Sequence, residues 1–117
     1  MQIPREAVLL RIFIAEGDRC GSHPLYEAIV LKARDAKLAG ATVLRGSAGF
    51  GQSHHLHTTK ILRLSTDLPL VVEIVDDEEK INAFLPVLDG MMEGGLVTLE
   101  KVRVLRYGRK VQENDGQ

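Results

Sequence analysis

VLLRIFIA, residues 8–15, is the stretch that decides the fold class of this 117-residue chain. Arg11 is its only charge, and three of its eight residues are β-branched. A short and nearly continuous apolar run of this kind predicts a central strand of a sheet. LVVEIV at residues 70–75 predicts a second strong strand, and the alternating apolar residues of 96–105 are typical of a last strand.

Two amphipathic helices are predicted between these strands. Apolar residues recur at helical spacing through 25–38, with Ser22 as a candidate N-cap and Gly40 at the place of a C-terminal helix glycine. The second helix is predicted from about 77 to 89, where acidic residues at its start suit the helix dipole. Pro86 lies inside that helix and is expected to kink or shorten it.

A shorter strand at 41–44 completes a βαββαβ order, with a long loop between it and the strand at 70–75. Residues 61–64 are a candidate for an additional short strand after that loop. Two βαβ units of this size favour an α+β, ferredoxin-like sandwich with one antiparallel sheet and two helices on one face. The whole chain, residues 1–117, fits a single domain. We expect an ordered core from about 8 to 108, followed by a polar C-terminal tail.

Composition excludes several classes of function. The formal net charge of -1 gives no long-range attraction to nucleic acid or to anionic membranes, so no nucleic-acid partner is expected. Cys20 is the only cysteine, which excludes an internal disulfide and a cysteine metal cluster. No apolar run approaches the ~18 residues of a membrane span. These features lead us to expect a cytoplasmic protein.

The pattern of apolar residues stops at 45–60, RGSAGFGQSHHLHTTK. Its glycines allow backbone N–H groups to face an anion, although a structural turn or bulge is the alternative. His54, His55 and His57 are candidate metal ligands, but His55 and His57 alone share a side of an extended segment. The alternative is that these histidines belong to a solvated loop or make polar contacts between subunits.

Two further groups of charged residues are candidates for ligand contacts. Arg103 and Arg106 can pair with phosphate, or can lie on a solvated sheet edge, and on a strand they point to opposite faces. The acidic run 76–79 is explained by its place at a helix start. No nucleophile, base and orienting group can be assembled from the sequence, so we expect no enzyme and no catalytic residue.

Several motifs together resemble the PII-like group of small proteins, which is related to the PII signal-transduction proteins. The segments that carry the resemblance are RIFI at 11–14, GATVLRG at 40–46, GFG at 49–51 with the His-bearing stretch to His57, STDLP at 65–69 and VEIVD at 72–76. The resemblance implies a ferredoxin-like fold, a homotrimer, and adenine nucleotides bound between adjacent subunits. It also implies that GFG opens a long T-loop-like segment after the second strand.

Two departures from the PII pattern bear on the ligand. No lysine follows Gly94-Gly95, and Val104 stands where a phosphate-contacting arginine is expected, with Arg103 one position off. Arg106 matches the arginine of the family's C-terminal Arg-x-Gly element. ADP or AMP is therefore favoured over ATP, and no cofactor is required. The residues expected to bind the ligand are Arg45, Gly46, Gly49, Phe50, Gly51, Gly94, Gly95, Arg103 and Arg106.

The function expected from sequence is that of a PII-like regulatory protein with a small anionic effector, an adenine nucleotide, in clefts between the subunits of a trimer. Its loop 49–60 would dock on a membrane transporter or an enzyme. The alternative is a metal-binding or protein-interaction module that uses the His-rich loop. Binding of a nucleotide or of a transition metal distinguishes these two hypotheses.

Overall fold

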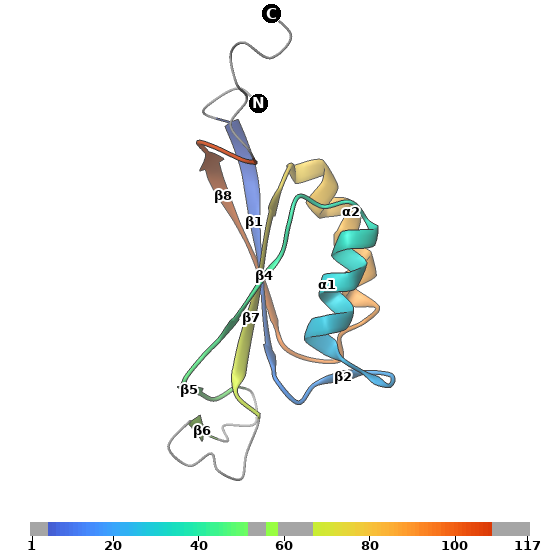
Figure 1. Ribbon diagram of the computed structural model, residues 1–117, viewed down its shortest axis with the longest axis vertical. Helices are drawn as coiled ribbons and strands as arrows, with labels where there is room; N and C mark the ends of the chain where they lie inside the picture. Colours follow the sequence, from blue (N-terminus) through green and yellow to red (C-terminus); the bar gives the residue numbers. More distant parts are fainter. Residues whose placement is uncertain (1–4, 52–55, 59–66, 109–117) are drawn as a thin grey trace, which may run out of the picture.

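The computed structural model describes residues 5–51, 56–58 and 67–108 of the chain. One four-stranded sheet carries both helices on the same face (Figure 1). Its strands are β1 (Arg5–Ala15), β4 (Thr42–Arg45), β7 (Pro69–Asp76) and β8 (Leu96–Val104), and the helices are α1 (Leu25–Asp35) and α2 (Glu78–Asp89). The spatial order is β4-β7-β1-β8, and each neighbouring pair is antiparallel. The predicted ferredoxin-like fold is therefore confirmed.

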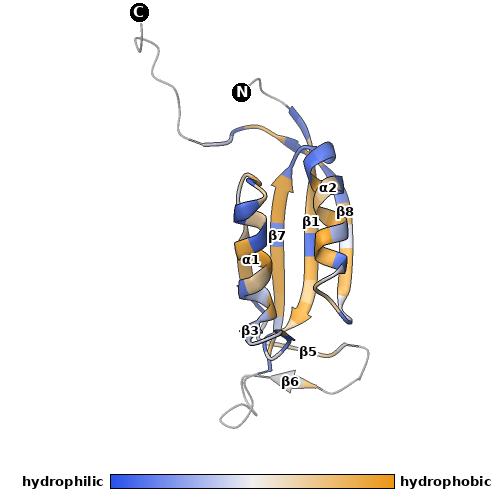
Figure 2. Cartoon of the chain, turned by 90° about the vertical axis from the view of Figure 1, so that its right-hand side faces the viewer, coloured by the Kyte–Doolittle hydropathy of each residue, from blue (hydrophilic) through white to orange (hydrophobic). Residues whose placement is uncertain are grey.

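The core lies between the helices and the even-numbered residues of the two central strands (Figure 2). Leu10 and Ile12 of β1 and Val72 of β7 are fully buried. They pack in one cluster with Ile29 of α1 and Phe84 of α2. Burial of such side chains contributes about 1.5–3 kcal/mol each, which makes this layer the main source of stability.

The odd-numbered residues of the central strands form a second sheet face, which we call the open face. In the strand register, Leu44, Val71, Phe13 and Leu96 stand side by side, one from each strand. Leu44 is 48% exposed and Leu96 is 55% exposed. Within the described part of the chain no helix covers this face (Figure 1). A row of apolar side chains across a whole sheet is thus left in contact with water.

Arg11 lies at the centre of the open face, directly opposite Glu73 of β7. Its Nε donates to Glu73 Oε2 at 2.9 Å, and its Nη1 donates to Glu100 Oε1 at 3.0 Å. The hydrogen bond to Glu73 raises the pKa of the guanidinium above its ordinary value, so Arg11 keeps its charge. Partly exposed ion pairs add little stability, but they fix three strands in register.

The ends of α1 differ from the sequence prediction. The N-cap is Pro24 and not Ser22, and the Leu25 N–H donates instead to the Asp18 carbonyl at 2.8 Å. The helix ends at Asp35, before the predicted residue 38, and Gly40 does not cap it. Lys37 adopts the left-handed conformation (φ 61°).

Helix α1 ends early because a Schellman motif closes it three residues before the predicted position at Gly40. The Leu38 N–H donates to the Ala33 carbonyl at 3.1 Å, and the Lys37 N–H donates to the Arg34 carbonyl at 2.9 Å. Leu38 then packs against the core.

In α2 the helix continues through Pro86 to Asp89, so the predicted shortening is wrong.

The structure contains two short hairpins that the sequence does not predict. β2 (Arg19–Cys20) pairs with β3 (His23–Pro24), and β5 (Ala48–Gly49) pairs with β6 (His57–Thr58). The strand predicted at 61–64 lies outside the described residues. No helix in the described ranges is long and apolar enough to cross a membrane.

Candidate functional site

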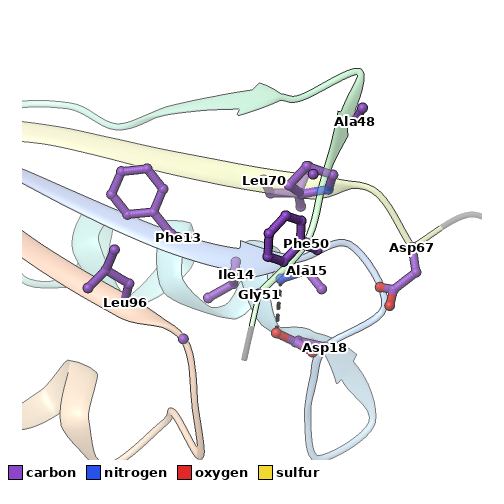
Figure 3. A pocket seen from close by; sticks show the side chains of 13 residues that line it. Phe13, Ile14, Ala15, Asp18, Ala48, Phe50, Gly51, Asp67, Leu70 and Leu96 are labelled. Atoms are coloured by element: carbon purple, nitrogen blue, oxygen red, sulfur yellow. Dashed lines mark hydrogen bonds between the residues drawn. The ribbon is translucent and has the colours of Figure 1, made fainter. Parts of the chain in front are cut away.

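A pocket of about 650 Å³ lies at the end of the sheet where β1 ends and β7 begins (Figure 3). The side chains of Phe13, Phe50, Leu70 and Leu96 give it apolar walls. They come from four segments that are far apart in the sequence. Phe13 and Leu96 also belong to the apolar row of the open face, so the pocket borders that face.

Glycines allow the segment from β4 to Phe50 to lie against Pro69. The Gly46 N–H donates to the Pro69 carbonyl at 2.7 Å. A Cβ at Gly46 would stand 2.9 Å from the Pro69 ring, and one at Gly49 would stand 3.2 Å from it. Larger residues would push this segment away from β7 and displace Phe50 from the pocket.

The end of β1 holds the segments on either side of residues 52–66. The Asp67 carboxylate accepts from the Gly17 N–H at 2.7 Å, and the Glu16 N–H donates to the Leu68 carbonyl at 2.8 Å. On the other side, Arg45 forms an ion pair with Glu16. Both ends of the predicted T-loop-like segment are therefore anchored to one turn of the chain.

Carboxylates are the charged groups of this pocket. Asp18 Oδ2 accepts from the Ala15 N–H at 3.0 Å (Figure 3), and Asp67 is the other carboxylate that lines the pocket. Among the described residues, no lysine or arginine lines the pocket. One chain alone thus offers an apolar wall and hydrogen-bond acceptors but no cation for a phosphate, and a negative pocket disfavours a free anion.

Gly95 lets the chain turn back onto β1 at the pocket wall. Its φ is 98°, a conformation that favours glycine. A Cβ there would lie 2.8 Å from the Phe13 carbonyl oxygen and 2.9 Å from Met92 Cε. Gly94 lines a different groove, beside α2, and a Cβ there would meet nothing within 4 Å.

The structure separates the predicted arginines from the pocket. Arg103 lies near the end of β8. Arg106 lies beyond that end, so the alternation of side chains along a strand does not decide where the Arg106 side chain points. The nine residues of β8 span about 30 Å, which places both arginines far from Gly95. Arg45 pairs with Glu16 and does not line the pocket.

The histidine prediction falls largely outside the described residues. His54 and His55 are not described, and only the backbone of His57 is placed, opposite Gly49. Within the described ranges, no group of three or more metal-ligating side chains occurs. Metal binding by His54, His55 and His57 stays a prediction.

Sequence reasoning missed the carboxylates of the pocket. The sequence alone predicts no ligand-binding role for Asp18 or Asp67. Their placement depends on which backbone N–H groups the fold brings close to them. Asp67, for example, accepts a hydrogen bond from the Gly17 N–H, which is 50 residues away in the sequence. No spacing in the sequence carries that information.

The chain has clear relatives. The family model described as DUF190, an uncharacterized ACR, matches residues 7–104. A UPF0166 protein of Aquifex aeolicus is 42% identical over 97 residues, which cover 83% of this chain and 91% of that protein. The UPF0166 protein MJ1524 of Methanocaldococcus jannaschii is 33% identical over 102 residues, which cover 86% and 94% respectively.

Solved structures of CPII, a nitrogen regulatory PII-like protein from Thiomonas intermedia K12, share the fold. The structure described as bound to ADP, AMP and bicarbonate gives a TM-score of 0.61 at 17% identity. The structure described as bound to ADP and bicarbonate gives 0.59 at 18%. Each comparison covers 88% of this chain and 92% of the CPII chain. The PII-like, ferredoxin-like architecture predicted from the sequence is thus confirmed.

The geometry at Gly95 predicts a sharp difference between two neighbouring glycines. Gly95→Ala introduces both a strained φ and a clash with the backbone of Phe13, so we expect a loss of about 1–3 kcal/mol in the free energy of unfolding. Gly94→Ala is the control and should change it by less than about 1 kcal/mol. Urea unfolding followed by circular dichroism measures both. Equal stability of the two variants would contradict the turn described here.

Proposed function

This chain belongs to the DUF190 family, and on that premise we propose that it is a PII-like regulatory protein that binds an adenine nucleotide in clefts shared between the subunits of a homotrimer. One observation carries the proposal. The apolar pocket lies at one end of β8, and Arg103 and Arg106 lie at the other end, so a site that needs both requires two chains. CPII, which shares the fold, is described as binding ADP and AMP.

The pocket suits the nucleoside part of such a ligand. Phe13, Phe50 and Leu96 offer an apolar surface on which a purine ring can pack. The Asp18 carboxylate, which accepts one backbone N–H, can accept a further hydrogen bond from a ribose hydroxyl. The volume of about 650 Å³ lies within the range of small-molecule sites.

The phosphates would meet Arg103 and Arg106 of the neighbouring subunit. Neither arginine has an ion-pair partner among the residues that the structure describes. Two arginines, with no lysine after Gly95, balance the charge of ADP or AMP better than that of ATP. The ligand-binding roles of Arg45, Gly46, Gly49, Gly51 and Gly94 are supporting ones in this proposal, as parts of the segments that shape the cleft.

The open face is the surface through which the subunits would associate. Its apolar row, from Leu44 to Leu96, would be removed from water in the trimer, which favours association. The Arg11 network with Glu73 and Glu100 is internally paired, so it can be covered without leaving an unpaired charge. The residues 49–60 would stay available to a transporter or enzyme target in the cytoplasm. The proposal assigns no catalytic residue, no cofactor and no nucleic-acid partner.

Substitution on the open face tests the association. Val71→Asp places a charge in the apolar row, and we expect it to convert a trimer of 12.9 kDa chains into folded monomers. Leu31→Asp on the exposed side of α1 is the control and should leave the trimer intact. Sedimentation equilibrium gives the mass of each protein. A trimeric Val71→Asp variant would show that the subunits meet through another surface.

Calorimetric titration tests the ligand. We expect ADP and AMP to bind more tightly than ATP, and Arg106→Gln to weaken ADP binding by about tenfold or more because a charge-assisted hydrogen bond is lost. Adenosine, which has no phosphate, should bind equally to both proteins. Arg34→Gln on α1 serves as the control. Absence of binding at millimolar ADP and AMP would end the nucleotide proposal, and an unchanged ADP affinity in Arg106→Gln would remove Arg106 from the site.

A further inference from the structure

Tyr107 connects the segment after the edge strand β8 to the chain that leads into the other edge strand, β4. Its hydroxyl donates to the Ala39 carbonyl at 2.7 Å, across 68 residues of sequence. Ala39 belongs to the connection between α1 and β4. The segment from Leu105 to Gly108 therefore does not simply continue β8 but turns back over the end of the sheet (Figure 1).

The acceptor is itself rigidly held. The Ala39 N–H donates to Asp76 Oδ2 at 2.8 Å, and the Asp77 N–H donates to Asp76 Oδ1 at 2.6 Å. Asp76 is 8% exposed, and it is the one buried charged residue in the described part of the chain. Both oxygens of its carboxylate are thus used to fix backbone. Tyr107 is thus bonded to a connection whose backbone is held by the buried carboxylate of Asp76.

Arg106 lies between two anchored positions. Val104 on one side ends β8, where it pairs with Arg5 of β1. Tyr107 on the other side is held by Ala39. Arg106 also borders a small cavity of about 250 Å³ together with Ala7 and Val75, which belong to the open face. Its backbone is therefore fixed at the rim of the surface through which we propose that subunits associate, while its guanidinium has no described ion-pair partner.

We propose that Tyr107 is a positioning residue for the ligand: its hydroxyl pre-orders Arg106 so that the guanidinium reaches the phosphate of a nucleotide in the neighbouring subunit's pocket. This inference rests on the proposed function. Chain segments beyond the last strand fray unless they are tied down, and ordering one on binding costs conformational entropy. A hydrogen bond that orders Arg106 beforehand removes that cost from the binding step.

Tyr107→Phe removes the hydroxyl and keeps the ring, and Tyr26→Phe is the matched control because Tyr26 makes no such bond in the described structure. We expect Tyr107→Phe to weaken ADP binding about three- to tenfold, the range of one lost hydrogen bond. In an Arg106→Gln background the same substitution should cost no further affinity, because the two residues act as one unit. Adenosine binding should not change. Trypsin should cleave after Arg106 faster in unliganded Tyr107→Phe than in the wild type, at equal melting temperature.

Three results would overturn the inference. Equal ADP affinity of wild type and Tyr107→Phe would show that the hydroxyl does not prepare Arg106. Additive losses in the double variant would show a general structural effect and no positioning. A wild type that binds neither ADP nor AMP would overturn the proposed function and the phosphate role together. That failure is distinct because it is seen before any substitution at Tyr107 is made.

Discussion

The whole arrangement depends on the antiparallel pairing of β1 with both β7 and β8. Because side chains alternate along a strand, this register sends Leu10 and Ile12 under the helices and Phe13 onto the open face. A slip of one residue would exchange core and surface along the entire strand. The same register places the apolar pocket at one end of the open face and Arg106 at the other. The core, the open face and the candidate pocket are thus consequences of one pairing pattern.

The layers of the fold could be predicted from the sequence because the patterns that specify them are long. The nearly continuous apolar run around Ile12 and the helical spacing through α1 and α2 each extend over eight residues or more. Local detail could not be predicted where it depended on competing caps. Lys37 takes the left-handed position that Gly40 was expected to take, because bonds to Ala33 and Arg34 close the helix first. Two-residue strands such as β2 and β5 are too short to leave a pattern.

The candidate site could be predicted from the sequence only in part. Glycines such as Gly46 and Gly95 can be recognised from the sequence as candidate turn residues, but the close contacts that require them, with Pro69 and Phe13, appear only in the folded chain. The roles of Asp18, Asp67 and Tyr107 depend on backbone groups that only the folded chain brings near them. The distance between Arg106 and the pocket likewise follows from strand length and topology. In the proposed function, each chain would supply an apolar, acceptor-bearing half-site at one end of its sheet and a cationic half-site at the other.

The most direct test of this division is a mixing experiment with two complementary variants. Phe50→Asp adds a carboxylate to the pocket at a residue that is 63% exposed, and the double variant Arg103→Gln/Arg106→Gln removes the cations. The account predicts that neither variant alone binds ADP tightly, and that trimers assembled from equal amounts of both recover about a quarter of the wild-type sites, since each shared site needs one intact half from each variant. Mixed trimers that bind no more ADP than the separate variants would contradict a site built by two subunits.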